Sequence, residues 1–140
     1  MAKALKLQLV TPDRTIFEGE VDELTAPGEV GPFTILINHT PIVSALVPGT
    51  FRYRFGKGEE NFVLGGGFLE FHENQATVLA SSAEKPEQID LDRAERSRQR
   101  AEQRLQHAVD GTIDYDRARA SRDRAKARIT AAQQATTGRR

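Results

Sequence analysis

Apolar and polar residues alternate in the first part of the chain, as they do in strands that bury one face. Apolar side chains occupy every second position in residues 5–9 and again in residues 51–55. Shorter apolar runs lie at residues 15–17, 21–25, 62–64, 68–71 and 77–79, and turn-forming residues interrupt them at 11–14, 18–20, 56–58 and 73–75. Many short strands with closely spaced turns predict an antiparallel β-sandwich or a barrel.

The pattern changes near Pro86, after which there is no Phe and Gly occurs only at positions 111 and 138. Ala, Arg, Gln and Glu dominate, and all four are good helix formers. Asp90 is the predicted N-cap of a first helix with the inward stripe Leu91, Ala94, Arg98, Ala101, Leu105 and Ala108. After the interruption Asp110-Gly111-Thr112, Asp114 is the predicted cap of a second helix with the stripe Ala118, Ala125, Ile129 and Ala132. Two helices joined by a short loop predict an antiparallel hairpin.

The predicted fold is therefore α+β. It has an N-terminal antiparallel β-sandwich in residues 1–85, a C-terminal α-helical hairpin in residues 86–135 and a flexible tail in residues 136–140. The hairpin stripe is mostly alanine, and a buried methylene contributes only about 0.8 kcal/mol. Two interpretations stay open: a weakly held hairpin that docks in more than one place, or a permanently docked, alanine-rich one.

The net charge is zero because two oppositely charged parts cancel. Residues 1–84 carry 6 Lys and Arg against 11 Asp and Glu, a net charge of −5, whereas residues 85–140 carry 14 against 9, a net charge of +5. Two parts with different partners are therefore expected. No apolar run approaches the ~20 residues of a membrane span, and the N-terminus lacks a signal peptide's apolar stretch. We expect a cytoplasmic protein without membrane insertion; the lack of Cys excludes thiol catalysis.

Four motifs occur in order along the chain. Residues 27–41 (PGEVGPFTILINHTP) combine a Gly-Glu-x-Gly element, a short apolar strand and an Asn-His-x-Pro turn. Residues 47–49 (VPG), 65–70 (GGGFLE) and 113–115 (IDY) follow. Each motif alone is weak, but together, over nearly the whole chain, they resemble the epsilon subunits of bacterial F-type ATP synthases.

The resemblance implies a β-sandwich followed by a helical hairpin, as the residue pattern does. It implies a non-catalytic central-stalk subunit of the rotor, with no catalytic residues and no required cofactor, that helps to couple ion flow to ATP synthesis. The sandwich would bind the gamma subunit and the c-ring. The hairpin would extend to the alpha and beta subunits of the catalytic head and inhibit ATP hydrolysis. The expected location is peripheral, on the cytoplasmic face of the bacterial cell membrane.

The first of these motifs is the expected rotor contact, with Glu29, Asn38, His39 and Pro41 as its contact residues. Asn38 and Pro41 favour a turn from which His39 projects. Glu29, together with Asp22, would meet polar loops of the c-ring. The alternative for His39 is a structural role, in which its ring forms a hydrogen bond within the turn.

Residues 89–94 (IDLDRA) match the Ile/Leu-Asp-x-x-Arg-Ala motif of epsilon subunits that bind ATP. By position, the resemblance implies ATP as a regulatory ligand of Glu84, Ile89, Asp90, Arg93, Ala94, Arg100, Arg124 and Arg128. Arg93 and Arg100, seven residues apart, share one helix face, and the other two arginines share a face of the second helix. A folded hairpin could therefore bring several guanidiniums to a triphosphate, while the two acids accept hydrogen bonds from adenine or ribose. Bound ATP would then favour the folded hairpin. The alternative is an ordinary solvated face of paired charges.

Other kinds of site find less support. Gly65-Gly66-Gly67 is not followed by Gly-Lys-Ser/Thr, so it is not a phosphate loop; we expect a bulge or close packing there. The three histidines are far apart and lack metal-ligand spacing, so no metal site is expected. A nucleic-acid-binding module built on the basic hairpin is the main rival, yet residues 85–140 offer only Tyr115 for stacking on bases. A small regulatory enzyme with its site in the sandwich is a second rival that no motif identifies.

Overall fold

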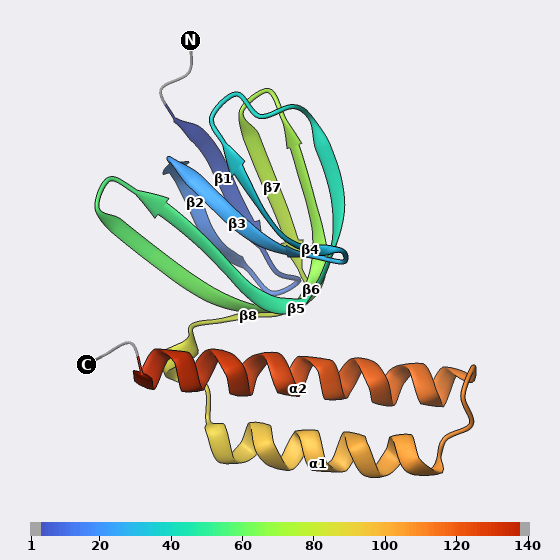
Figure 1. Ribbon diagram of the computed structural model, residues 1–140. Helices are drawn as coiled ribbons and strands as arrows, with labels where there is room; N and C mark the ends of the chain where they lie inside the picture. The colour runs from blue at the N-terminus through green and yellow to red at the C-terminus, as the bar shows by residue number, and fades with distance from the viewer. Residues whose placement is uncertain (1–3, 138–140) are drawn as a thin grey trace. The chain divides into compact units, whose positions relative to one another are not determined.

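The computed structural model describes residues 4–137 and divides between Glu84 and Lys85 into two compact units, here called the β unit and the hairpin unit (Figure 1). The strands of the β unit are β1 (Leu5–Val10), β2 (Thr15–Val21), β3 (Glu23–Gly28), β4 (Gly31–Leu36), β5 (Ile42–Phe55), β6 (Gly58–His72), β7 (Gln75–Ala80) and β8 (Ala83–Glu84). The hairpin unit contains the short 3-10 helix η1 (Pro86–Gln88) and the helices α1 (Leu91–His107) and α2 (Ile113–Thr137). The predicted α+β fold, strands first and helices second, is confirmed.

The strands form one hydrogen-bonded sheet in the order β2-β1-β7-β6-β5-β3-β4, with β8 paired to β6. Neighbouring strands run antiparallel, apart from the parallel pair β1 and β7. The predicted break at residues 18–20 is wrong, because these residues pair in register with residues 6–8 of β1. The chain breaks at Asp22 instead, where the carboxylate accepts a hydrogen bond from the backbone N–H of Gly56 at 2.6 Å.

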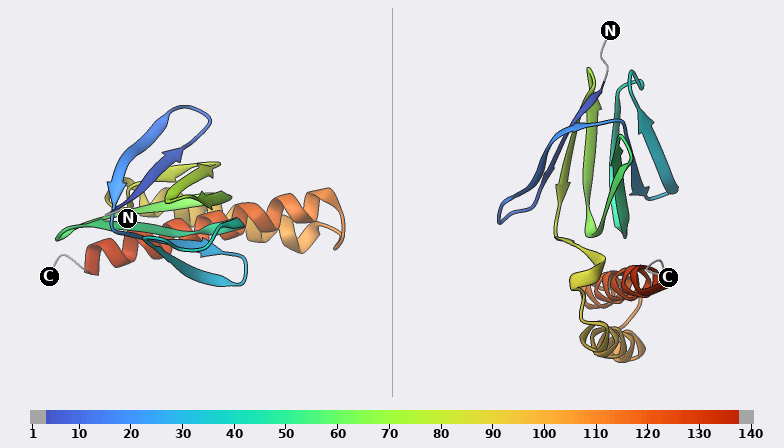
Figure 2. Two further views of the ribbon diagram at one scale, coloured as in Figure 1. Left: turned by 90° about the horizontal axis from the view of Figure 1, so that it is seen from above. Right: turned by 90° about the vertical axis from the view of Figure 1, so that its left-hand side faces the viewer.

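The sheet folds over on itself, so that strands far apart in the sheet order face one another across a core (Figure 2). The ring of Phe17 on β2 stacks on Tyr53 of β5 with 4.4 Å between ring centroids, although three strands lie between β2 and β5 in the sheet order. Buried apolar side chains from β1 through β7 fill the space between the layers, and Phe51 and Phe71 are the largest that are fully buried. This closed core confirms the predicted sandwich.

Strand β6 runs without a break through Gly65–Gly67, where the sequence predicts a bulge or close packing. Its pairing with β5 stays in step on both sides, so there is no bulge. Gly66 and Gly67 have φ angles of 104° and 153°, and a Cβ on Gly67 would overlap the carbonyl oxygen of Leu79 and lie 2.9 Å from the Cα of Ala80. Close packing therefore explains this glycine-rich segment.

Both helices of the hairpin unit begin at a side-chain cap. The predicted cap of α1 is confirmed, because Asp90 Oδ1 accepts a hydrogen bond from the backbone N–H of Arg93 at 3.1 Å. The predicted cap of α2, Asp114, is wrong. The helix begins at Ile113. The hydroxyl oxygen of Thr112 accepts the capping hydrogen bond from the backbone N–H of Tyr115 at 3.2 Å. Asp114 lies in the first turn instead, where a negative charge is favourable.

The two helices lie antiparallel and side by side (Figures 1 and 2), with small side chains in the buried positions. The predicted stripe of α2 is buried throughout, at Ala118, Ala125, Ile129 and Ala132. In α1, Ala94 and Ala101 are fully buried, but Leu91 is 41% exposed. Counted at 3.6 residues per turn, Leu91 lies about 70° around the helix from these alanines. Helix α2 continues to Thr137, so residues 136 and 137, expected in the tail, are helical. The rest of that tail lies outside the described residues.

Candidate functional site

A loop at one end of the β unit, residues 37–41, joins β4 to β5 and is here called the contact loop (Figure 1). It begins with a β-turn, closed by a hydrogen bond from the backbone N–H of His39 to the carbonyl oxygen of Leu36 at 3.1 Å. The third residue of this turn, Asn38, has a φ of 67°. A type II turn requires such a left-handed residue, and asparagine accepts that conformation more readily than most residues. The expected turn is therefore present.

His39 is half-buried, and its ring is held by the loop itself. Its Nδ1 lies 2.6 Å from the carbonyl oxygen of Thr40, and its ring meets the edge of Phe71 at 5.9 Å between centroids. Because a carbonyl oxygen only accepts, Nδ1 carries the proton, and Nε2 is the ring nitrogen that can meet a partner. The hydrogen bond within the turn, considered above as the alternative for His39, is thus formed, and it also fixes the ring's orientation.

Asn38 is tied to a second turn that is distant in sequence. Its backbone N–H donates to Asn74 Oδ1 at 2.6 Å, and its own Oδ1 accepts from Asn74 Nδ2 at 2.9 Å. Asn74 belongs to the two-residue turn between β6 and β7, which lies beside the contact loop in both figures of the whole chain. We call this reciprocal pair of hydrogen bonds the asparagine clasp.

The other two expected contact residues differ in position. Pro41 is exposed at the end of the contact loop, directly before β5. Glu29 is also exposed, but it lies in the tight turn between β3 and β4, at the end of β4 opposite to the one that leads to Asn38. Since β4 has six residues at roughly 3.4 Å each, about 20 Å of strand separates the two positions. The structure thus groups Asn38, His39 and Pro41 and leaves Glu29 apart.

Two of the expected nucleotide ligands, Ile89 and Ala94, are buried and contribute to packing. Asp90 is exposed, but its Oδ1 already accepts the capping hydrogen bond of α1, which leaves Oδ2 for a ligand. Glu84 is half-buried at the end of β8. The four arginines are spread along the two helices. Their side chains are exposed at Arg93, Arg100 and Arg124 and half-buried at Arg128.

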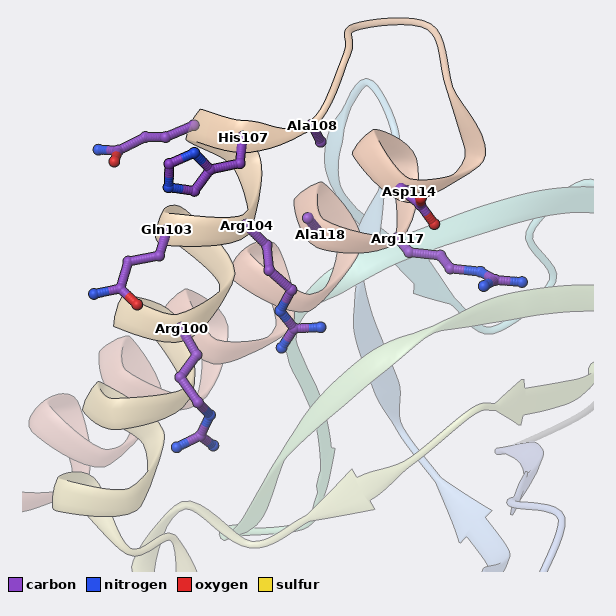
Figure 3. Close-up of a pocket in the computed structure, with 9 residues that line it drawn as sticks. Arg100, Gln103, Arg104, His107, Ala108, Asp114, Arg117 and Ala118 are labelled. Atoms are coloured by element: carbon purple, nitrogen blue, oxygen red, sulfur yellow. The ribbon is translucent and has the colours of Figure 1, made fainter.

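An open hollow of about 850 Å³ lies between the C-terminal half of α1 and the first turns of α2 (Figure 3). Arg100 lines it together with Arg104, His107 and Arg117, and Asp114 is the one acid in its lining. The volume is within the ~300–1,000 Å³ of small-molecule sites, although this hollow is open to solvent. Of the four expected arginines, only Arg100 lines this hollow. Sequence reasoning missed Arg104 and Arg117, whose proximity depends on how the two helices are aligned.

Not every arginine of the hairpin is available to a ligand. Arg98 forms ion pairs with Glu95 and, at 2.8 Å, with Glu102 on the same helix face. The hydrogen bonds that Arg98 donates to these two carboxylates raise the pKa of its guanidinium. The expected solvated face of paired charges is therefore present around Arg98. Among residues 4–137, no group of three or more His, Asp or Glu side chains is placed to hold a metal ion.

The sequence matches two consecutive families of known domains. Residues 4–86 match the family described as ATP synthase, Delta/Epsilon chain, beta-sandwich domain. Residues 87–133 match ATP synthase, Delta/Epsilon chain, long alpha-helix domain. The boundary between the matches falls within two residues of the division between the β unit and the hairpin unit.

Curated relatives carry the name ATP synthase epsilon chain. The chain is 45% identical over 105 residues to the one from Nitratidesulfovibrio vulgaris strain DP4, covering 75% of this chain and 78% of the relative. It is 43% identical over 107 residues to the one from Desulfosudis oleivorans, covering 76% and 80%. It is 46% identical over 102 residues to the one from Anaeromyxobacter sp. strain Fw109-5, covering 73% and 77%.

Two solved structures share the fold at 18% sequence identity. One is a chain of the Euglena gracilis mitochondrial ATP synthase, with a TM-score of 0.80, covering 98% of this chain and 83% of that one. The other is a chain from the central stalk and c-ring of the Tetrahymena thermophila mitochondrial ATP synthase, with a TM-score of 0.58, covering 94% and 95%. At this identity the similarity establishes the fold alone.

Proposed function

The chain belongs to the family of ATP synthase delta and epsilon chains, and we propose that it is the non-catalytic epsilon subunit of a central stalk. The observation that carries this proposal is that the two family matches follow one another across both units. In the proposed role, the β unit binds the gamma subunit and the c-ring, and the chain turns with them while ion flow drives ATP synthesis.

This role is tested by passing the full chain over immobilised gamma subunit of the cognate enzyme. Retention that survives high salt is expected, because the contact would combine apolar and hydrogen-bonded surface rather than charge alone. A nucleic-acid-binding module, the main rival, would instead bind DNA or RNA with an affinity that falls steeply as salt rises. Absence of retention by the gamma subunit would overturn the central-stalk role.

We place the c-ring contact at the contact loop. Its turn is fixed, Pro41 is exposed, and the ring of His39 is oriented with Nε2 able to meet a partner. Replacing His39 by alanine should weaken binding to the gamma–c-ring complex several-fold. His72 is a matched control, since it is an exposed histidine on β6 outside the loop. Equal effects of the two substitutions would refute the assignment.

We propose that the hairpin unit restrains ATP hydrolysis by leaving its folded form and extending toward the catalytic head. Support comes from the buried apolar side chains of α1 and α2, which are alanines apart from Ile129. Each leucine-to-alanine difference removes three carbons, about 2.4 kcal/mol of burial at about 0.8 kcal/mol per methylene. Such a seam separates at a much lower cost than the core of the β unit, which contains Phe51, Phe71 and many leucines.

Truncation after Lys85 tests this division of labour. The shortened chain should fold, join the enzyme and leave hydrolysis faster than the full chain does. It should also preserve ATP synthesis, because the rotor contact lies in the β unit. Unchanged hydrolysis by an enzyme that has incorporated the shortened chain would refute the inhibitory role. A shortened chain that does not fold would contradict the independence of the β unit.

ATP is the proposed regulatory ligand of the hairpin, held by the arginines of the Ile-Asp-x-x-Arg-Ala region. The exposed guanidiniums of Arg93, Arg100 and Arg124 support this proposal, since they are able to form bidentate hydrogen bonds with phosphate oxygens. The hollow suggests that a different group of arginines would bind the phosphates, namely Arg100 together with Arg104 and Arg117. Either grouping would favour the folded hairpin when ATP is abundant.

An NMR titration of the full chain with ATP separates these groupings. Shift changes confined to the hairpin are expected at millimolar ATP or below, and their absence would eliminate the ligand. Replacing Arg93 and Arg124 by glutamine should abolish the changes if the motif holds the phosphates. Replacing Arg104 and Arg117 should do so if the hollow holds them. Each pair is the control for the other, because both remove two exposed positive charges.

No helix in residues 4–137 is long and apolar enough to cross a membrane. The family membership supports a peripheral position, in which the chain reaches the membrane through the c-ring. We place it on the cytoplasmic face of the bacterial cell membrane. Co-sedimentation with membranes that depends on the rest of the ATP synthase, and is lost when the enzyme is stripped off, is the expected result.

A further inference from the structure

The turn between β6 and β7 is built in an unusual way for its residues. Glu73 and Asn74 have φ angles of 49° and 60°, both in the left-handed region that a type I′ hairpin turn requires. Asparagine tolerates this region, but glutamate rarely adopts it. Strained positions persist where the surrounding structure holds them in place. At this turn, the holding contacts converge on Asn74.

Asn74 links its turn to two other segments of the β unit. Its carbonyl oxygen accepts from the backbone N–H of Lys6 at 2.8 Å, next to the start of β1. Both ends of its side-chain amide form hydrogen bonds with the same residue: Oδ1 accepts from the backbone N–H of Asn38, and Nδ2 donates to Asn38 Oδ1. The two asparagines are 36 residues apart. Of the hydrogen bonds formed by the described residues, those two are the ones that connect the contact loop to a distant part of the sequence.

We propose that Asn74 is a positioning residue for the rotor contact, and that the asparagine clasp holds the contact loop in the conformation that binds. This inference rests on the proposed role of the contact loop. The clasp fixes Asn38, the left-handed residue of the loop's turn, and the next residue is His39. Without the clasp the loop keeps its sequence but samples other conformations. Apparent affinity then falls in proportion to the fraction of chains that are ready to bind.

The test replaces Asn74 by glycine in the full chain. Glycine keeps the left-handed backbone of the turn and removes both clasp hydrogen bonds. The matched control is Glu73→Gly, which frees the adjacent left-handed position and leaves the clasp intact. Two neutral hydrogen bonds correspond to about one order of magnitude in an equilibrium. Asn74→Gly should therefore bind the gamma–c-ring complex about tenfold more weakly, whereas the control should bind like the unaltered chain.

Two further measurements distinguish positioning from general destabilisation. In the free chain, hydrogen exchange at the backbone N–H of Asn38 should accelerate in Asn74→Gly, while the protected amides of the β-unit core should not change. Asn74→Asp should restore much of the affinity, because the carboxylate accepts from Asn38 N–H and, once the Asn38 amide turns over, from its Nδ2 as well. Equally weak binding by Asn74→Asp and Asn74→Gly would contradict the role of the clasp.

The outcomes also separate this inference from the proposed function. If the unaltered chain does not bind the gamma–c-ring complex, the rotor contact itself is wrong. If it binds, but Asn74→Gly and Glu73→Gly bind equally well, the rotor contact stands and the positioning role of Asn74 is refuted. Unchanged exchange at Asn38 in Asn74→Gly would show that the clasp does not hold the loop in solution, which refutes the inference as well.

Discussion

Replacing Gly67 by alanine would place a methyl group where the β unit has no room for it. Gly67 lies in β6, where it pairs with Leu46 of β5 on one side and Ala80 of β7 on the other. An added Cβ would overlap the carbonyl oxygen of Leu79 and approach the Cα of Ala80 to 2.9 Å. Both neighbours are backbone atoms of a paired strand, so neither can move aside by changing a rotamer.

Two costs add up at this position. The φ of 153° is one that a residue with a side chain rarely adopts, and such strain costs about 1–3 kcal/mol. Relieving the overlap requires a backbone shift in β7, at about 1–3 kcal/mol more. The total of about 2–6 kcal/mol is a large share of the ~5–15 kcal/mol that stabilises a domain. With a urea dependence of about 1–2 kcal/mol per M, a mid-range cost of about 4 kcal/mol should lower the unfolding midpoint by roughly 2–4 M.

Urea unfolding of the β unit, followed by circular dichroism, measures this shift, and two other glycines are controls. Gly31 has a φ of 137° with no atom within 4 Å of an added Cβ, and Gly66 has a φ of 104° with its nearest contact at 3.5 Å. Alanine at either position costs only the conformational strain, so about half the shift is expected. If Gly67→Ala unfolds at the same urea concentration as these controls, the overlap does not limit the strand, and the reasoning fails.

Two other predictions concern single side chains. Thr112→Ala should lower the free energy of unfolding of the hairpin unit by about 1 kcal/mol, because the cap of α2 is lost. The thermal loss of helical circular dichroism measures this change. Asp114→Ala should lower the free energy of unfolding by less, and a larger loss for Asp114→Ala than for Thr112→Ala would contradict the assigned cap. Burial, followed by the charge of Glu60, raises the pKa of Tyr53, so its phenol should titrate above 10.0 in a Tyr115→Phe chain, followed by phenolate absorbance. Since the folded pKa is the higher one, the associated stability is complete below the unfolded pKa and is lost as pH rises through the folded pKa; normal titration of Tyr53 would refute this.

The fold could be predicted from the sequence wherever one period dominates a segment. The alternation in residues 5–9 and 51–55 defines strands whose apolar side chains are buried, except for Phe55 at the end of β5, which is 51% exposed. The three-to-four-residue spacing after Pro86 defines the helices. The run Glu18-Gly19-Glu20 misled because its residues are typical of turns. Pairing with β1 supplies the backbone hydrogen bonds there, and this tertiary partner overrides the local preference.

The sites were harder to predict than the fold, because their geometry depends on contacts between distant residues. The sequence predicts Asn74 only as part of a turn. Nothing in the sequence links it to Asn38, because a hydrogen bond between two isolated side chains leaves no repeating pattern along the chain. Arg104 and Arg117 come together only through the alignment of α1 with α2, which an alanine-rich stripe does not specify. The predicted set of arginines came from a family motif, and the motif does not include either of them.

The contrast between the two units limits where regulation can act. A ligand that binds one conformation stabilises it by about 2.7 kcal/mol at a concentration one hundred times its dissociation constant. That amount is small beside the burial of Phe51, Phe71 and the surrounding leucines, so the β unit keeps one structure whether or not a ligand is present. It is comparable to the burial of three or four methyl groups, which is about half of the six buried alanines of the hairpin unit. In the proposed function, a nucleotide held by the hairpin would therefore change the hairpin's conformation while the contact loop stays in place, so that one chain would bind the rotor and respond to ATP independently.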